Sequence, residues 1–100
     1  MIIVAGTLHL AAQDRDRYLA AVAGVAPLAR VAPGCLDFVQ AADPIDPERI
    51  NIYERWESDA YLERFRASGE PGEPGEEEPA VPRLRAAHVR KYRIATVEDP

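Results

Sequence analysis

The chain has 100 residues, 47% of them hydrophobic, and a formal net charge of -5 at pH 7. This size and hydrophobic content suit one globular domain, which we expect to span residues 1–97, and they exclude a disordered chain. Five glutamates between residues 70 and 78 account for the negative excess. The other charges are balanced and scattered, so no surface for nucleic acid is expected.

The apolar start of the chain is too short for a membrane span. It runs from Met1 to Ala12, whereas a membrane helix needs about 20 apolar residues. We therefore interpret it as a buried strand and expect no membrane association. The single cysteine, Cys35, cannot form an internal disulfide, which fits a cytoplasmic location. We interpret it as a small buried hydrophobe and not as a nucleophile.

The first half of the sequence predicts a strand followed by a helix. Residues 2–10 are apolar on both alternations for most of their length, which indicates an inner strand. A helix is expected from Asp14 to about Val31, with Asp14 as its N-cap. Pro27 should kink or split this helix. Its apolar stripe consists of Tyr18, Val22, Val25 and Ala29.

The centre of the chain predicts a hairpin that leads directly into a second helix. Strands are expected at Cys35–Ala42 and at Arg49–Glu57, joined by the turn-rich segment DPIDPE. Trp56 is the last large side chain of the second of these strands. Ser58 is the expected N-cap of the following helix, which should end near residues 67–69.

The last third predicts a loop and a final strand. The acidic Pro/Gly-rich segment 69–79 should be a solvated loop, and His88–Val97 a strand. The order β-α-β-β-α-β is typical of an α+β, ferredoxin-like domain. Right-handed crossovers place the first and third strands in the middle and the fourth beside the first. Two helices cover one sheet face, so we expect a homodimer that covers the other, sheet against sheet.

Two histidines are candidate catalytic residues. The first and last strands should be antiparallel neighbours, which brings His9 and His88 to matching ends. Two imidazoles could offer a base or a weak metal site, although two ligands alone make a poor one. A register slip of one residue would place them on opposite faces. A structural or exposed role stays open beside catalysis, and no metal is predicted.

Three aromatic residues are candidates for a binding pocket. Trp56 either forms a pocket wall, with its indole N–H as a donor, or belongs to the core. Tyr61 and Phe65 are four residues apart on the second helix and so share one face, as pocket wall or as core.

The run PGCLDF at residues 33–38, a DP-rich turn, and then YERWES at residues 53–58 resemble the antibiotic biosynthesis monooxygenase family. This family includes quinol monooxygenase-like proteins and is related to haem-degrading monooxygenases. The resemblance implies a dimeric α+β barrel of ferredoxin-like protomers, each with a pocket between helices and sheet.

The resemblance also implies an activity. Characterised members oxidise electron-rich phenols, anthrones or quinols with dioxygen, often without metal or flavin, so no cofactor is expected here. Trp56 matches the strand-end tryptophan of the family. Asn51 is the nearest counterpart of an asparagine that precedes this tryptophan in anthrone oxygenases. Haem-degrading relatives use a strand asparagine and a histidine after the second helix. This chain has Gly6-Thr7 on its first strand and no histidine between residues 67 and 87, so haem binding is not expected.

These observations predict a cofactor-independent monooxygenase that oxidises a small aromatic, phenolic or quinol-type substrate with dioxygen. The alternatives are a non-catalytic ligand-binding or regulatory dimer of the same fold, and a cofactor-free polyketide cyclase or isomerase. The expected partners are a second copy of the chain and a small aromatic ligand. The predicted catalytic residues are His9 and His88, and the predicted substrate-binding residues are Asn51, Trp56, Tyr61 and Phe65.

Overall fold

The computed structural model describes residues 1–68 and 81–100. The predicted acidic loop 69–79 therefore lies outside the described residues. The elements, in chain order, are β1 (Ile2–His9), α1 (Ala12–Ala21), α2 (Val25–Arg30), β2 (Cys35–Ala42), β3 (Arg49–Trp56), α3 (Asp59–Ala67) and β4 (Ala86–Arg93). No described helix has the length and apolar character needed to cross a membrane.

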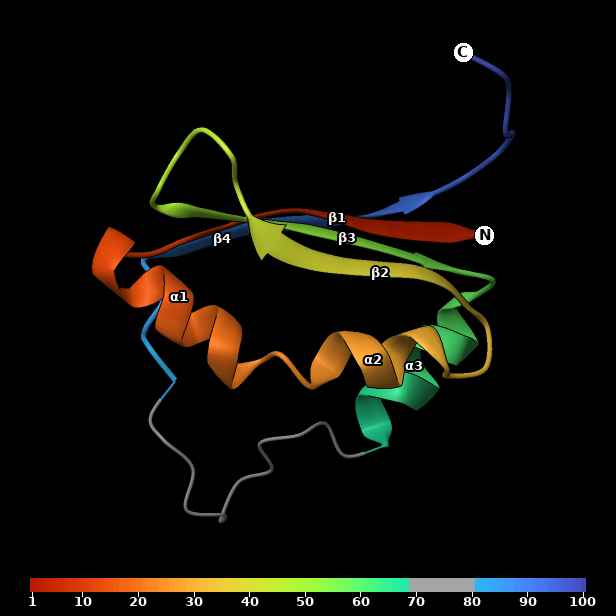
Figure 1. Ribbon diagram of the computed structural model, residues 1–100. Helices are drawn as coiled ribbons and strands as arrows, with labels where there is room; N and C mark the ends of the chain where they lie inside the picture. The colour runs from red at the N-terminus through yellow and green to blue at the C-terminus, as the bar shows by residue number, and fades with distance from the viewer. Residues whose placement is uncertain (69–80) are drawn as a thin grey trace.

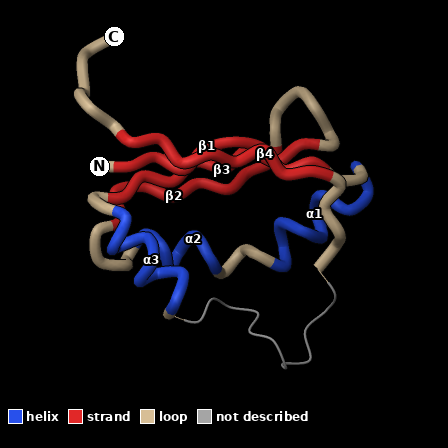
Figure 2. The backbone as a smooth tube through the Cα atoms, turned by 180° about the vertical axis from the view of Figure 1, so that it is seen from behind, coloured by secondary structure: helices blue, strands red, loops and turns tan. Residues whose placement is uncertain are grey.

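The four strands form one antiparallel sheet in the order β2-β3-β1-β4. The predicted α+β, ferredoxin-like arrangement, with β1 and β3 in the middle, is confirmed. The three helices of the described residues lie against the same face of this sheet, and none of them lies on the opposite face (Figures 1 and 2). These two faces are called the helix face and the open face below.

Strand β3 shows why the sheet has two different faces. Its burial alternates strictly, and Ile50, Ile52, Glu54 and Trp56 are the buried positions. Successive side chains of a strand point to opposite faces, so these four point toward the helices. In β1 the even-numbered residues Ile2, Val4 and Leu8 are buried beside them. Odd-numbered residues of β1 and β3 therefore form the open face.

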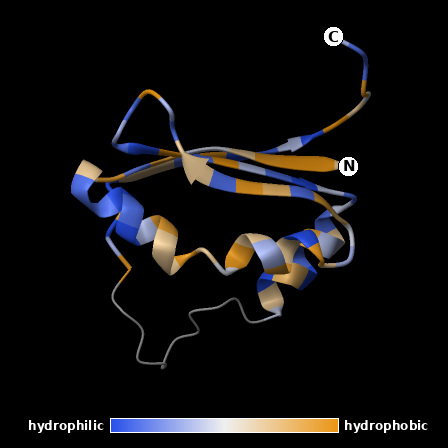
Figure 3. Ribbon diagram, in the orientation of Figure 1, coloured by the Kyte–Doolittle hydropathy of each residue, from blue (hydrophilic) through white to orange (hydrophobic). Residues whose placement is uncertain are grey.

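The core of the helix face has two parts. One lies under α2 and α3 and includes Ile2, Phe38, Trp56, Leu62 and Phe65. The other lies nearer α1 and consists of Leu8, Leu10, Ile50 and Ile52. Helix α1 has no buried residue of its own, and Figure 3 colours much of it as hydrophilic. Helix α1 therefore adds no fully buried side chain to the core, whereas α2 adds Ala29 and α3 adds Leu62 and Phe65.

The helix predicted over residues 14–31 is split, but residues 22–24 and not the expected Pro27 divide it. The segment forms α1 and α2, separated by a turn at residues 22–24. Pro27 is the third residue of α2, where the backbone N–H has no acceptor within the helix in any case. The expected N-cap is also wrong, because Ala11 occupies that position. Asp14 lies in the first turn and accepts a hydrogen bond from Arg17 at 2.7 Å.

The last strand was predicted too far along the chain. Strand β4 ends at Arg93, which is paired with Ile2, and begins at Ala86, which is paired with His9. The length of β1 sets both limits, because a residue beyond its ends has no partner strand. Similarly, β3 ends at Trp56 and not at the expected residue 57. Cys35–Ala42 was predicted with the observed bounds.

Strand β3 leads directly into α3, as predicted, with Ser58 between them. Ser58 is the N-cap in extended conformation, although its hydroxyl makes no capping hydrogen bond. Asp59 in the first turn accepts from Lys91 and from Arg93, each at 2.6 Å. These ion pairs connect α3 to β4. They also hold the pKa of Asp59 at about 2, well below its usual range.

Candidate active site

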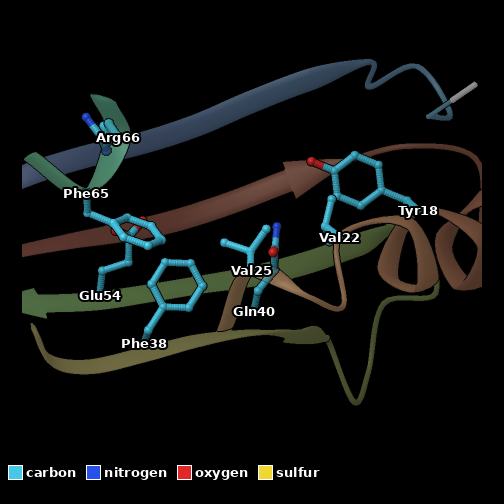
Figure 4. Close-up of a pocket in the computed structure, with 8 residues that line it drawn as sticks. All are labelled: Tyr18, Val22, Val25, Phe38, Gln40, Glu54, Phe65 and Arg66. Atoms are coloured by element: carbon cyan, nitrogen blue, oxygen red, sulfur yellow. The ribbon is translucent and has the colours of Figure 1, made fainter. Parts of the chain in front are cut away.

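A cavity lies between the helix face of the sheet and the helices. Its volume is about 250 Å³, and it is called the first cavity. Strands β2 and β3 form its floor, and residues of all three helices and of the turn after α1 form its walls (Figure 4). The lining residues are Tyr18, Val22, Val25, Phe38, Gln40, Glu54, Phe65 and Arg66.

Aromatic rings form one end of the first cavity. The ring of Phe38 from β2 and that of Phe65 from α3 meet edge to face, with centroids 6.4 Å apart. Behind Phe65 lies Trp56, at a centroid distance of 5.4 Å. Aromatic side chains present flat apolar surfaces that stack on another ring. This end of the cavity therefore suits an aromatic ligand.

Glu54 is the residue of this cavity that the predictions missed. It lies opposite Phe38 in the β2–β3 register and is only 9% exposed. The indole Nε1–H of Trp56 donates a hydrogen bond to its Oε1 at 3.1 Å. A carboxyl group at the wall of a cavity, next to aromatic rings, is a candidate general base. Period-two alternation from Ile50 to Trp56 could have identified it, since it places one glutamate on a buried face.

Further polar groups line the same cavity. Figure 4 shows the hydroxyl of Tyr18 turned toward the middle of the cavity, with Glu54 beside Phe65 at the other end. Burial raises the pKa of the Tyr18 phenol above 10.0, so it is a hydrogen-bond donor at neutral pH. Gln40 offers an amide, and Arg66 brings a positive charge.

The three predicted pocket aromatics have different places. Trp56 has no exposed surface and lines no cavity described here, because it lies behind Phe65 and below Glu54. Phe65 lines the first cavity as expected. Tyr61 lines a second cavity of about 210 Å³ together with Ala32, Pro33, Arg64, Phe65 and Ser68. Phe65 is thus the residue that both cavities share.

The predicted proximity of His9 and His88 is confirmed. Their ring centroids are 5.4 Å apart, in an edge-to-face arrangement. The Nε2 of His9 also lies 2.7 Å from Oγ1 of Thr7. Both histidines are on the open face, because Leu8 points to the core and His88 pairs with Thr7. The sheet separates them from the first cavity, and their catalytic role stays a prediction.

Asn51 is also on the open face, where it stabilises the β2–β3 loop. Its side-chain amide donates to Asp43 at 2.8 Å, and its carbonyl accepts from Nε of Arg49 at 2.7 Å. The backbone N–H of Asp46 and this amide lower the pKa of Asp43 to about 2. A role of Asn51 in substrate binding stays a prediction.

The described residues give little support to a metal site or to a reactive cysteine. No cluster of three or more histidine, cysteine, aspartate or glutamate side chains there could hold a metal ion. Burial raises the pKa of the Cys35 thiol, which disfavours the reactive thiolate. This agrees with a packing role for Cys35.

Residues 1–90 match the model of the antibiotic biosynthesis monooxygenase family. No curated protein matches the sequence. A Deinococcus radiodurans structure assigned to that family covers 100% of this chain and 98% of its own, with a TM-score of 0.78 and 19% identity. A Pseudomonas aeruginosa protein is 28% identical, with 94% of each chain covered and a TM-score of 0.65.

A third similar structure is that of MhuD, a haem degrader of Mycobacterium tuberculosis determined with two haems in its active site. It is 19% identical, covers 99% of this chain and 100% of its own, and has a TM-score of 0.68. At this level of identity the likeness shows a common fold.

Proposed function

Because the chain belongs to the antibiotic biosynthesis monooxygenase family, we propose that it oxidises a small phenolic or quinol-type aromatic with dioxygen in the first cavity. The observation that carries this proposal is the buried carboxyl group of Glu54 beside the rings of Phe38 and Phe65. Phenol oxidation needs a proton acceptor next to a flat apolar surface, and this arrangement provides both.

The cavity volume supports a small substrate. An apolar cavity of about 150 Å³ is enough to bind benzene in another protein. The first cavity, at about 250 Å³, therefore has room for one aromatic ring with substituents or for two fused rings. The rings of Phe38 and Phe65 would pack against the substrate and bring its hydroxyl group to Glu54.

The proposed reaction begins with transfer of the phenolic proton to Glu54. The phenolate then gives one electron to dioxygen, and the resulting superoxide and phenoxyl radical combine in a new C–O bond at an ortho or para carbon that bears hydrogen. Cleavage of the O–O bond, with loss of the hydrogen on that carbon, gives a quinone and water. Phenol and dioxygen thus become quinone and water. The substrate supplies all four electrons, so the reaction balances without another reductant.

The first cavity does not suit haem as a cofactor. Among the described residues, its lining has no histidine, cysteine or methionine, which are common axial ligands of haem iron. Tyrosine is a further ligand type, but burial raises the pKa of Tyr18 and disfavours the phenolate that binds iron. We therefore derive no step through haem.

The test is oxygen uptake by the purified protein with hydroquinone and naphthol, which fit the first cavity, and with anthrone as a larger three-ring comparison. Glu54→Gln should lower kcat by about 10²–10⁴-fold if Glu54 is the base. The matched control is Glu57→Gln, which changes an exposed glutamate just beyond the same strand. With labelled dioxygen, one labelled atom should enter the product.

Other outcomes identify the alternatives. Ligand binding without oxygen uptake across the series would favour a ligand-binding dimer, and product formation under nitrogen would favour a cyclase or isomerase. Loss of activity in His9→Gln or His88→Gln but not in Glu54→Gln would identify a histidine of this pair, and not Glu54, as the base.

For the assembly we propose a homodimer in which the open faces of two sheets meet. Support comes from Tyr92, which is paired with Ile3 on this face and is 52% exposed. A large aromatic side chain on a sheet face without helices gains most from burial against a second copy. We also propose a cytoplasmic location, because the single cysteine cannot form an internal disulfide.

A further inference from the structure

Phe65 lines both the first and the second cavity. The first cavity lies on the sheet side of α3, and the second lies between α3 and the turn that leads into β2. Their volumes are about 250 and 210 Å³, and Phe65 is the one residue that appears in both linings. A single side chain thus borders two spaces of similar size.

The ring of Phe65 packs against the sheet. It contacts Phe38 and Trp56, at centroid distances of 6.4 and 5.4 Å, and both neighbours belong to the sheet. Phe65 also borders the second cavity, together with Tyr61, Arg64 and Pro33. Truncating Phe65 would therefore connect the cavities without removing a residue of the sheet.

We propose that Phe65 determines the size of the substrate by closing the first cavity. This inference rests on the proposed function, since it concerns ligands of the same cavity. With Phe65 in place, the space beside Glu54 holds one or two rings. Without it, the connected space nearly doubles and accommodates three fused rings, the third lying between Tyr61 and Pro33. The substrate class is accordingly mono- and bicyclic phenols.

The test measures binding under nitrogen, so that turnover plays no part. Isothermal titration calorimetry compares 1-naphthol, with two fused rings, and 2-hydroxyanthracene, with three, on the full chain. The wild type should bind the two-ring compound more tightly. In Phe65→Ala the ratio of the two dissociation constants should shift toward the three-ring compound by roughly tenfold or more. Phe65→Leu should give a smaller shift in the same direction.

The matched control is Leu62→Ala. Leu62 lies on the same helix, is 2% exposed and lines neither cavity, so its truncation weakens the same core without joining the two spaces. The ratio should stay at the wild-type value. Thermal unfolding shows whether each variant is folded. If Phe65→Ala does not fold, the ratio of dissociation constants in Phe65→Leu tests the proposal instead.

Three results would overturn the proposal. They are equal binding of both compounds by the wild type, an unchanged ratio in the folded Phe65 variants, or an equal shift in Leu62→Ala. Failure of the proposed function looks different: oxygen uptake is absent, but the size selection in binding and its change at Phe65 persist.

Discussion

Trp56 and Glu54 are two residues apart on β3, so their side chains lie on the same face of the sheet. The indole N–H reaches the carboxyl group at 3.1 Å, and neither side chain has much contact with solvent. Trp56 therefore acts through Glu54 in the proposed reaction. It is a positioning residue, whereas a direct contact between its ring and the substrate remains a prediction.

Replacing Trp56 with Phe removes the hydrogen bond and keeps an aromatic ring in the core. A hydrogen bond to a charged group contributes about 1.5–3 kcal/mol, so kcat should fall by roughly 10–100-fold. The carboxylate also loses a donor, so the acid limb of the pH–rate profile should move to higher pH. Steady-state kinetics from pH 5 to 9 measure both effects. Tyr92→Phe is the control, and an unchanged pH profile in Trp56→Phe would contradict the positioning role.

For individual residues, the sequence predicts which side chains lie near the cavity better than it predicts what each of them does. Phe65 was predicted at the pocket because residues 61 and 65 share a helix face, and it lines the cavity. Glu54 was overlooked although it lies inside the YERWES run, because a glutamate usually faces solvent. The hydrogen bonds of Asn51 to Arg49 and Asp43 depend on the fold of the β2–β3 loop. Local sequence does not specify such partners.

Among the connecting elements, the turn before β2 depends most on one residue. Gly34 has φ +79°, and a Cβ atom there would collide with the ring of Tyr61. Gly34→Ala should lower the free energy of unfolding by at least about 1–2 kcal/mol, the cost of a left-handed alanine alone. Gly24→Ala is the matched control, because Gly24 has φ -76° in the helical region. There alanine should be neutral or stabilise by about 0.4–1 kcal/mol. Urea unfolding measures both, and equal effects would contradict this account.

The contact between α3 and β4 should make stability depend on pH. Hydrogen bonds from Lys91 and Arg93 lower the pKa of Asp59 from 3.8 to about 2. Because the folded value is below the unfolded one, the stabilisation is complete above about pH 4 and is lost as pH falls toward 2. Urea midpoints at pH 5, 4, 3 and 2 should therefore decline less in Asp59→Asn than in the wild type. Asp99→Asn, in the C-terminal tail, should follow the wild type. Parallel declines in wild type and Asp59→Asn would refute the linkage.

The elements themselves could be predicted where the sequence has a clear period. Alternating residues defined β2 and β3 to within one position, and Ser58 marked the start of α3. The helical period continued across residues 22–24, so the split between α1 and α2 was placed at Pro27 instead. The limits of β4 follow from its pairing with β1. The sequence of one strand does not show which strand it will pair with or where that strand ends.

For the whole molecule, the sequence was sufficient for the strand order but not for the distribution of polar groups between the two faces. Connectivity and handedness lead to β2-β3-β1-β4. They do not specify whether His9 and His88 point toward the helices, because a shift of one residue reverses the face. The observed register places Glu54 in the first cavity and both histidines on the open face.

The open face provides a direct test of the proposed homodimer. Tyr92→Asp places a charge on this face, whereas Leu28→Asp places one on α2, away from it. The two side chains are 52% and 50% exposed, so the substitutions disturb the folded chain to a similar degree. An unpaired charge costs several kcal/mol when it is buried in an interface. Light scattering after size exclusion should therefore show dimers for the wild type and Leu28→Asp at micromolar concentration, and monomers for Tyr92→Asp. A monomeric wild type would remove the homodimer proposal, and dimers in all three samples would move the interface away from the open face.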